Sequence, residues 1–474
     1  MITLSEIIRA LTNKTIMSCK LPITEAVIDS RKVIPGSLFI ALQGEQTDGH
    51  QYINSAFKNG ANFALISKDL PVNEYRILDI RNLKEAKALK IPAAPFCIRV
   101  DDSLKAMQNI ARYWRKKLPI RVIGITGSVG KSSTKELTAE VLSQKYYTYK
   151  NPGNYNNEIG LPLTILNLGN GYERLVLEMG FYYPGEITFL CDISIPEVGV
   201  ITNIGTVHAE RAGSQQAIAE GKSELITSLP GKPQGTAILN YDDPYVRAMA
   251  KKTPAEILFY GLNPQADLWA DDIQGQGLKG IRFRMHYQGK SAILDVPMLG
   301  RHSVQTILRA SAIGFTEGLS IEEITEGLVN SNSQLRLVAV RTESGALILD
   351  DTYNATPEST IAALDLLSEL SGQKIAVLGD MLELGQYEDI GHEHVGQRVA
   401  EVANYLIAVG PRGRTIAEIA KRKGLPSTAV ACVDDAIAAA ELLRYNLKNG
   451  DVVLIKGSRG LRMERISSIL EAEI

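Results

Sequence analysis

The feature that most constrains this chain is a glycine-rich turn in the stretch VIGITGSVGKSSTKE, residues 122–136. The preceding residues, IRVIGIT, have the length and β-branched content of a buried strand, and KSSTKELTAEVLSQK has helical periodicity. A turn that leads into a helix in this way presents free backbone N–H groups and the positive end of the helix dipole to an anion. The sequence therefore predicts a phosphate-binding loop between a strand and a helix.

Individual residues of this loop have expected roles. Lys131 can reach the β- and γ-phosphates of a nucleotide, and the Ser132 hydroxyl can bind Mg²⁺. Ile125 occupies the position of the first glycine in the usual pattern G-x-x-x-x-G-K-[ST], so a tight glycine turn with a solvated lysine is the alternative. The expected ATP-binding residues of the loop are Gly127, Ser128, Gly130, Lys131, Ser132 and Ser133.

Composition narrows the class of protein. The 474 residues are 45% hydrophobic and 22% charged, the ordinary mix of a globular protein with two to four domains. A net charge of −2 and a pI of about 6.4 give no electrostatic case for nucleic acid or an anionic membrane as a partner. We expect no signal peptide and no membrane span. The four cysteines form no Cys-x-x-Cys pair, which favours scattered thiols in a reducing cytoplasm.

Alternating strand-like and helix-like segments indicate an α/β fold with parallel sheets. We expect three domains, with bounds at 1–99, 100–332 and 333–474. The middle domain holds the loop and also IRFRMHY, an alternating strand among glycines that predicts a small antiparallel insertion. In the third domain KIAVLG, YLIAVG and DVVLIKG each precede a helical segment, so we expect a second, Rossmann-like nucleotide fold.

Polar residues recur where the predicted strands of the middle domain end. ERLVLEMG reaches Glu178, VGVITNIGTVH ends at His208, and GTAILNYDD reaches Asn240. Ligands of open α/β sheets sit at these carboxyl ends, and Mg²⁺ prefers oxygen ligands, so Glu178 and Ser132 are candidate metal ligands. Taken alone, Glu178 is more often a solvated carboxylate and His208 a loop histidine.

The third domain begins near SQLRLVAVRTESGALILDD and contains a further polar stretch, ILDDTYNATPES. Asp351, Tyr353 and Asn354 follow a predicted strand end, where they could contact a nucleotide. They could equally form only a turn that caps the helix ESTIAALDLLSEL. Arg336 lies just before them, at the expected domain junction.

Together these motifs resemble the Mur ligase family over nearly the whole chain. DSRKVIPGSLFIALQGEQTDGHQYI is similar to the family's uridine-nucleotide motif, and TGSVGKSSTKE to its phosphate loop, which also lacks the first glycine. The branch that adds D-alanyl-D-alanine is the most similar one, through the stretches NPGNYNNEIGLPLTIL, LEMGFYYPGEI, DDTYNATP, LGDMLELG and KGSRGLRME. The resemblance implies an ATP-dependent ligase of cytoplasmic peptidoglycan-precursor synthesis, which supports cell-wall biogenesis, cell shape and cell division.

The resemblance also implies ligands and residue roles. The first domain would bind the UDP part of UDP-MurNAc-tripeptide, the second Mg-ATP, and the third D-Ala-D-Ala. The implied UDP-substrate residues are Ser30, Arg31, Asp48, His50, Asn156 and Asn157. The implied metal ligands are Ser132, Glu178, His208 and Lys222, the last carbamylated by CO₂. The implied catalytic residues are Lys131, His208, Lys222 and Arg336, with Asn240, Asp351, Tyr353 and Asn354 on the nucleotide.

Some residues depart from the family pattern, and two other functions stay open. Ser303 in GRHSVQ replaces an asparagine near the adenine, and SQLRL replaces a Gly-Arg-Met-like string around Arg336. By pattern alone, QQAIAEGKSEL is an ordinary amphipathic helix in which Lys222 is solvated. The competing functions are another Mur-type or folylpolyglutamate-type ligase and a nucleotide-binding regulator without ligase activity. We expect a monomer, and the sequence does not identify the third residue of the stem peptide.

Overall fold

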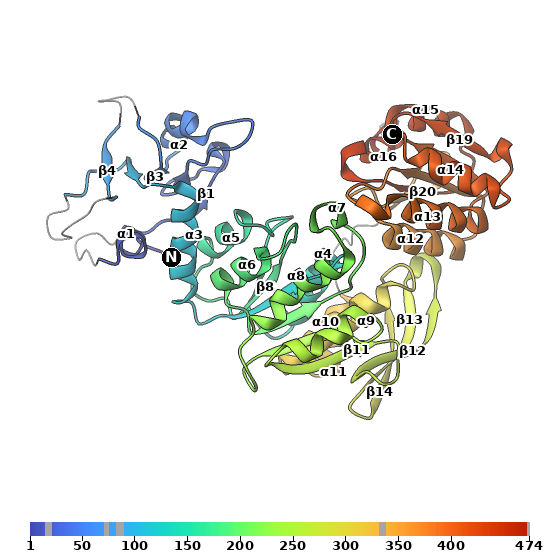
Figure 1. The fold of residues 1–474 in the computed structure, drawn as a ribbon, viewed down its shortest axis with the longest axis horizontal. Helices are drawn as coiled ribbons and strands as arrows, with labels where there is room; N and C mark the ends of the chain where they lie inside the picture. The colour runs from blue at the N-terminus through green and yellow to red at the C-terminus, as the bar shows by residue number, and fades with distance from the viewer. Residues whose placement is uncertain (15–20, 71–74, 82–89, 331–337, 472–474) are drawn as a thin grey trace. The chain divides into compact units, whose positions relative to one another are not determined.

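The computed structural model describes residues 1–14, 21–70, 75–81, 90–330 and 338–471. Cys19 and Arg336 lie outside the described residues. Strands and helices alternate along the described chain (Figure 1). The strands form three sheets, of five, nine and six strands. The predicted α/β class with mostly parallel sheets is therefore confirmed.

The bounds of the elements follow the chain in order. The strands are β1 Ala26–Val27, β2 Leu38–Ile40, β3 Phe63–Ile66, β4 Ile77–Asp79, β5 Phe96–Arg99, β6 Arg121–Thr126, β7 Thr148–Lys150, β8 Arg174–Glu178, β9 Val198–Ile201, β10 Thr236–Asn240, β11 Glu256–Gly261, β12 Leu268–Gly275, β13 Ile281–Tyr287, β14 Lys290–Val296, β15 Val338–Arg341, β16 Leu347–Asp350, β17 Lys374–Gly379, β18 Tyr405–Val409, β19 Val430–Val433 and β20 Val452–Lys456. The α-helices are α1 Leu4–Thr12, α2 Ile53–Lys58, α3 Ser103–Arg115, α4 Lys131–Leu142, α5 Gly160–Leu166, α6 Glu186–Ser194, α7 Ala209–Ala212, α8 Gln215–Thr227, α9 Pro244–Ala248, α10 Ser303–Thr316, α11 Ile321–Val329, α12 Pro357–Glu369, α13 Glu388–Val402, α14 Gly413–Arg422, α15 Ala436–Asn446 and α16 Glu464–Glu471.

The chain divides into two compact units. The first comprises residues 1–124, 146–180 and 186–197, and the second comprises residues 125–145, 181–185 and 198–474. The expected domain bounds at 1–99, 100–332 and 333–474 stay a prediction.

The first unit contains the five-stranded sheet, which is parallel throughout in the order β1-β2-β3-β5-β4. Its central strands β3 and β5 are almost wholly buried, as their apolar runs FALI and FCIR require. The edge strand β4 alternates between exposed and buried residues instead. Helix α3 begins at the N-cap residue Asp102, whose carboxylate accepts from the N–H of Lys105.

The nine-stranded sheet has the order β14-β13-β12-β11-β10-β9-β6-β8-β7. Within the second unit, β9, β10, β11 and β12 pair in parallel, and β12, β13 and β14 then form an antiparallel meander. The meander confirms the predicted antiparallel insertion. Buried and more exposed side chains alternate along most of β13, the strand IRFRMHY, as its sequence pattern predicts.

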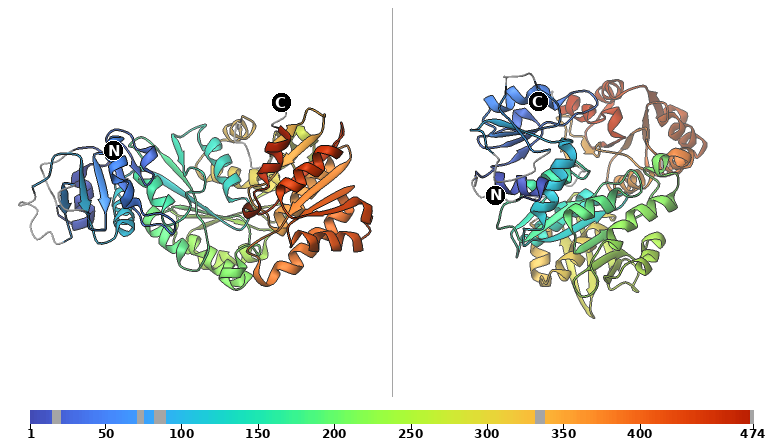
Figure 2. Two further views of the ribbon diagram at one scale, coloured as in Figure 1. Left: turned by 90° about the horizontal axis from the view of Figure 1, so that it is seen from above. Right: turned by 60° about the vertical axis from the view of Figure 1, so that its left-hand side comes forward.

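The six-stranded sheet of the second unit has the order β15-β16-β20-β17-β18-β19. Only the edge strand β15 is antiparallel to its neighbour. One apolar core packs α12, α13 and α14 against one face of the sheet, and another packs α15 and α16 against the other face (Figure 2). Helices on both faces of a parallel sheet are the doubly wound arrangement, so the predicted Rossmann-like fold is confirmed.

Candidate functional site

The predicted strand, loop and helix around Lys131 are present as β6, residues 127–130 and α4. Gly127 and Gly130 have φ angles of 146° and 83°, a backbone conformation that side chains disfavour. A Cβ atom at Gly127 would lie 1.8 Å from Oγ1 of Thr202. Glycine is therefore required at this turn by both conformation and space.

The residues that follow β9 hold the loop in place. The N–H groups of Ser128 and Val129 donate to the main-chain oxygen and the Oδ1 of Asn203, at 2.9 and 3.0 Å. The Thr202 hydroxyl donates to the Val129 carbonyl at 2.7 Å. The prediction that this strand continues to His208 is wrong, because β9 ends at Ile201 and the chain turns to bind the loop. Sequence patterns missed Asn203.

Two lysines converge on one carbonyl of the loop. The Nζ of Lys131 donates to the oxygens of Gly127 and Ser128, at 2.9 and 3.3 Å. The Nζ of Lys222, on α8, donates to the same Gly127 oxygen at 3.1 Å. Lys222 is fully buried, so the interpretation of this side chain as a solvated helix lysine is wrong. The Lys131 ammonium makes this end of the loop attractive to phosphate.

An aromatic ring covers Lys222. The Phe181 ring centroid lies 4.7 Å from the Lys222 Nζ, a cation–π distance. A Cβ atom on the adjacent Gly221 would lie 2.1 Å from the Phe181 ring. Glycine at 221 thus allows the ring to approach the helix closely beside the lysine.

His208 contacts a carboxylate from the loop after β17. Its Nδ1 is 2.7 Å from Oε2 of Glu383. Burial lowers the pKa of His208; Glu383 opposes this shift, and the positive charges of Lys131 and Lys222 add to it. The contact with His208 lowers the pKa of Glu383. A neutral imidazole retains a lone pair that can bind a metal ion.

The loop that carries Glu383 is held at several points. Glu383 itself has a φ of 66°, unusual for a residue with a side chain. On its N-terminal side, the Met381 N–H donates to Nε2 of His392 at 3.2 Å, and the Leu382 N–H donates to the Ser458 hydroxyl at 2.9 Å. Oδ1 of Asp380 accepts two N–H groups at the start of α14. These contacts fix the backbone that directs Glu383 toward His208.

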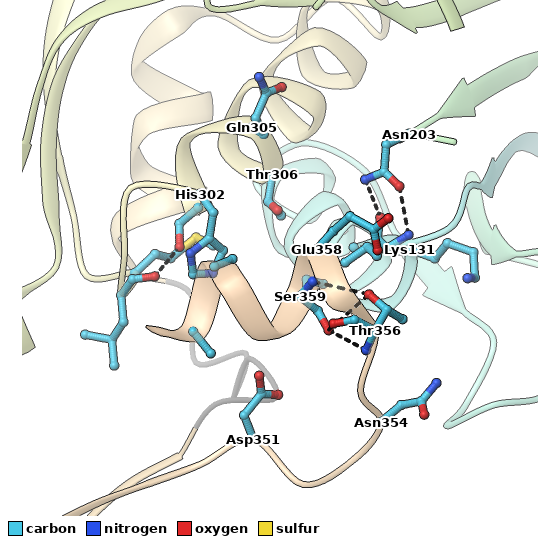
Figure 3. Close-up of a pocket in the computed structure, with 18 of the residues that line it drawn as sticks. Lys131, Asn203, His302, Gln305, Thr306, Asp351, Asn354, Thr356, Glu358 and Ser359 are labelled. Carbon is cyan, nitrogen blue, oxygen red and sulfur yellow. Dashed lines mark hydrogen bonds between the residues drawn. The ribbon is translucent and has the colours of Figure 1, made fainter. Parts of the chain in front are cut away.

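A cavity of about 650 Å³ lies beside the loop in the second unit (Figure 3). The loop contributes to its wall, as do α10 and the segment around the start of α12. Residues predicted to bind ATP that line the cavity are Ser128, Gly130, Lys131, Ser133, Asn240, Asp351 and Asn354. Those that the cavity lining does not include are Gly127, Ser132 and Tyr353, the last of which is 42% exposed.

A buried lysine that sequence patterns missed orders one wall of the cavity. The Nζ of Lys456, at the end of β20, lies 2.7 Å from Oδ2 of Asp351 and donates to the Asn354 carbonyl at 2.8 Å. Thr356 accepts the N–H of Ser359 and caps α12, as the capping interpretation of DDTYNATPES predicts, and a contact of Asp351 and Asn354 with a nucleotide stays a prediction. The cavity thus combines charged groups with a rigid helix N-terminus.

Ser303, the departure from the family pattern, also lines this cavity. Its hydroxyl donates to the Leu299 carbonyl four residues earlier. The neighbouring His302 is exposed at the cavity, and desolvation by the surrounding protein lowers its pKa; Asp351 opposes the shift and Lys456 adds to it. The serine hydroxyl therefore bonds within its own segment. An asparagine at this position would have a longer side chain that ends in an amide.

The first unit contains Glu178, at the end of β8. It is 2% exposed, so the interpretation as a solvated carboxylate is wrong. Its Oε1 accepts from the side-chain amide of Asn156 at 2.8 Å. The side-chain amide of Asn151 accepts the Glu178 N–H and donates to the Glu178 carbonyl. Sequence patterns missed Asn151. Asn157 instead caps α5, where its Oδ1 accepts the N–H of Gly160.

The expected uridine-nucleotide residues Ser30, Arg31, Asp48 and His50 lie in the first unit and differ in exposure. The Arg31 side chain is 86% exposed and pairs with Asp29 at 2.8 Å. His50 is buried, with Nδ1 2.7 Å from Oδ1 of Asp48 and Nε2 accepting the N–H of Ser67. Both ring nitrogens of His50 are thus occupied by the protein. Ser30, just before Arg31, is also buried.

Magnesium and carbamate are two groups that the family resemblance implies. The described residues contain no cluster of three or more His, Cys, Asp or Glu side chains suited to a metal ion. Mg²⁺ commonly uses one or two protein ligands together with substrate phosphates, so the neutral His208 and the Ser132 hydroxyl fit it. A carbamylated Lys222 keeps one N–H on Nζ, which can still donate to the Gly127 carbonyl.

In the part of the chain that the structure describes, no helix is both long and apolar enough to cross a membrane. Arg336, predicted to contact phosphate, lies outside the described residues, so its role stays a prediction.

Family models match most of the chain. The Mur ligase family catalytic domain matches residues 22–115, the Mur ligase middle domain residues 125–314, and the Mur ligase glutamate ligase domain residues 335–459. A UDP-N-acetylmuramoyl-tripeptide–D-alanyl-D-alanine ligase of Bacillus subtilis (strain 168) is 35% identical over 443 residues, 92% of this chain and 91% of that protein.

Two solved structures are similar in fold over almost their full lengths. MurF from Acinetobacter baumannii superposes with a TM-score of 0.83 at 27% identity, covering 98% of both chains. MurF ligase from Thermotoga maritima in complex with ADP has a TM-score of 0.79 at 29% identity, covering 95% of this chain and 97% of that one.

Proposed function

Because this chain belongs to the Mur ligase family, we propose that it joins D-alanyl-D-alanine to the C-terminal carboxylate of UDP-MurNAc-tripeptide with ATP. The observation that carries this proposal is the phosphate loop with Lys131 and Lys222 on one carbonyl, beside a cavity large enough for a nucleotide. The names of the B. subtilis relative and of the A. baumannii structure support the choice of substrates.

The chemistry requires activation, because a carboxylate does not condense with an amine in water. The peptide carboxylate attacks the γ-phosphorus of ATP, the bond to ADP breaks, and an acyl phosphate forms. The amine of D-Ala-D-Ala then attacks the acyl carbon through a tetrahedral intermediate, phosphate leaves, and the amine loses a proton. Positioning and neutralisation of charge supply most of the rate enhancement.

The residues of this chain have assigned parts in that scheme. Lys131 neutralises the phosphoryl oxygens and Asn203 keeps the loop in shape around them. Asp351 and Asn354, ordered by Lys456, contact the nucleotide. The acyl phosphate must be shielded from water, and the half-buried Glu383 beside His208 extends the wall of the reaction centre.

In the second unit, Ser132, His208 and carbamylated Lys222 are the groups that would hold magnesium, and Glu178 of the first unit stays a candidate ligand from the family resemblance. A bound Mg²⁺ supplies positive charge to the phosphate oxygens. A lysine ammonium would repel that ion, whereas a carbamate offers oxygen ligands of the kind Mg²⁺ prefers. The complete burial of Lys222 supports a role at the site over a solvated surface role.

The first unit would bind the UDP portion of the substrate through Arg31, whose exposed guanidinium suits a diphosphate. Asp48 and His50 bond within the protein and would shape that surface. We further propose that the enzyme is a cytoplasmic monomer of peptidoglycan synthesis, and so contributes to cell shape and division.

An assay of ADP release tests the function. We expect release only when UDP-MurNAc-tripeptide, D-Ala-D-Ala and ATP are all present. Release with a different amino acid in place of the dipeptide would favour another Mur-type ligase, and release with a folate and glutamate would favour the folylpolyglutamate type. ADP binding without release under any of these conditions would favour a regulator.

The Lys222→Ala variant tests the carbamate. We expect loss of most ligase turnover and partial recovery when acetate is added, because acetate returns a carboxylate near the missing group. Carbon-13 NMR of the wild-type protein in labelled bicarbonate gives a readout without turnover. Unimpaired turnover of Lys222→Ala together with no carbamate resonance would refute this assignment.

A further inference from the structure

Arg309 is a buried arginine beside the phosphate loop. It lies on α10 with 3% of its surface exposed, and it lines the cavity next to Lys131 and Gly130. No sequence motif singled it out, and none of the roles proposed above uses it.

Among the residues that the structure describes, the hydrogen-bond partners of the Arg309 guanidinium are neutral hydroxyl groups. Nε donates to Oγ1 of Thr134 at 2.8 Å, Nη2 to Oγ1 of Thr306 at 2.8 Å, and Nη1 to the Tyr260 hydroxyl at 3.4 Å. Burial raises the pKa of Tyr260 to about 12, so this phenol is uncharged at neutral pH. Among the described residues, no carboxylate joins these partners within ion-pair distance.

A buried cation without a carboxylate is costly for a protein to keep. Buried charges are usually compensated by an opposite charge, and removal from water penalises the ion. Because Lys131 adds further positive charge at the loop, the protein itself does not compensate Arg309 here. Such an arrangement is typical of a site that binds an anion.

The contacts of Arg309 also shape the loop. Thr134 accepts from Arg309 and donates its own hydroxyl to the Gly130 carbonyl at 2.7 Å. A Cβ atom at Gly130 would lie 2.8 Å from Nη2 of Arg309. The guanidinium therefore packs directly against the last glycine before Lys131 and is linked to it through Thr134.

We propose that Arg309 is a positioning residue of the nucleotide site, which fixes the loop at Gly130 and supplies positive charge to the polyphosphate. This inference rests on the proposed binding of ATP. The charge acts on the phosphates across the loop, so its effect increases with the number of phosphate groups on the ligand.

Calorimetric titration with ADP and with AMP tests the inference. The variants are Arg309→Met and Arg309→Gln, which remove the charge, and Arg309→Lys, which keeps it. We expect the two neutral variants to bind ADP roughly tenfold more weakly, with a clearly smaller loss for AMP. Arg309→Lys should recover most of the ADP affinity.

Arg115→Met is a matched control. Arg115 is also a buried arginine, 5% exposed, but its guanidinium bonds to main-chain carbonyls such as those of Ser194 and Leu118 in the first unit. The Arg115→Met substitution should lower the melting temperature and leave the ratio of ADP affinity to AMP affinity unchanged.

The outcomes separate this inference from the proposed function. If the wild-type protein does not bind ADP, the proposed function fails with it. If the wild type binds ADP and the neutral variants bind it equally well, the role of Arg309 is refuted alone. Equal losses for ADP and AMP would also refute it, because a purely structural role does not depend on phosphate number. Should Arg309→Met fail to fold, Arg309→Gln and Arg309→Lys give the same comparison.

Discussion

Gly221→Ala should destabilise helix α8 although alanine is the better helix former. Gly221 lies in the interior of this helix, and its φ is not in the left-handed region, so the backbone accepts any residue. The new Cβ would lie 2.1 Å from Cε2 and 2.6 Å from Cζ of Phe181. The first distance is about 1.4 Å short of an ordinary carbon contact.

The clash cannot be relieved cheaply. Phe181 is 2% exposed, so its ring has little space into which to move. Overpacking of a buried site costs about 1–3 kcal/mol, whereas replacing glycine by alanine in a helix gains up to about 1 kcal/mol. We therefore expect a net loss of about 1 kcal/mol in the local stability of α8, with displacement of the ring from Lys222.

Native-state hydrogen exchange of the α8 amides measures this local stability. The same substitution in a Phe181→Ala background should have the opposite sign, because the clash is gone and only the gain in helix propensity remains. Gly169→Ala serves as the control, since nothing lies within 4 Å of its Cβ position, and it should change stability by less than about 0.5 kcal/mol. Equal effects of Gly221→Ala in both backgrounds would refute the steric argument.

Three further predictions concern the site. Lys131→Ala should lower the rate of ADP release by on the order of 10²-fold or more. Its melting temperature should stay near that of the wild type. Near-normal turnover of this variant would contradict the role of the loop. Arg31→Ala should raise the KM for UDP-MurNAc-tripeptide and leave the KM for ATP unchanged; steady-state kinetics in which both rise equally would remove the first unit from UDP binding. Desolvation by the surrounding protein lowers the pKa of the exposed His302 below its unfolded value, so the unfolded state binds more protons as pH falls below about 6.5, and stability should decrease slightly there. Urea denaturation of His302→Phe should show a weaker decrease over the same pH range, and an identical pH profile would show that His302 does not contribute.

Local features of the fold could be predicted from sequence. The strand, loop and helix of residues 121–142 and the antiparallel strand β13 depend on neighbouring residues, whose spacing is visible in the chain. The true end of β9 was missed, because apolar content continues to Val207 while the backbone turns at Thr202 to bind the loop.

Contacts between distant parts of the chain could not be predicted in this way. Arg309 and Thr134 are 175 positions apart, and no periodicity links them. The pattern of α8 is that of an amphipathic helix and does not indicate that Lys222 is fully buried. Glu383 was likewise missed, because its contact with His208 depends on a left-handed backbone that its residue type does not suggest.

The loop of Glu383 has a consequence for how the protein matures during synthesis. The Leu382 N–H donates to the hydroxyl of Ser458, which lies 76 positions later in the chain and is therefore synthesised later. Asp380 and Met381 likewise depend on Gly413 and His392, both of which follow them. During synthesis, the loop that carries Glu383 can therefore adopt its final structure only after β20 has emerged from the ribosome. A chain released before that strand would carry an intact phosphate loop and an unformed partner for His208.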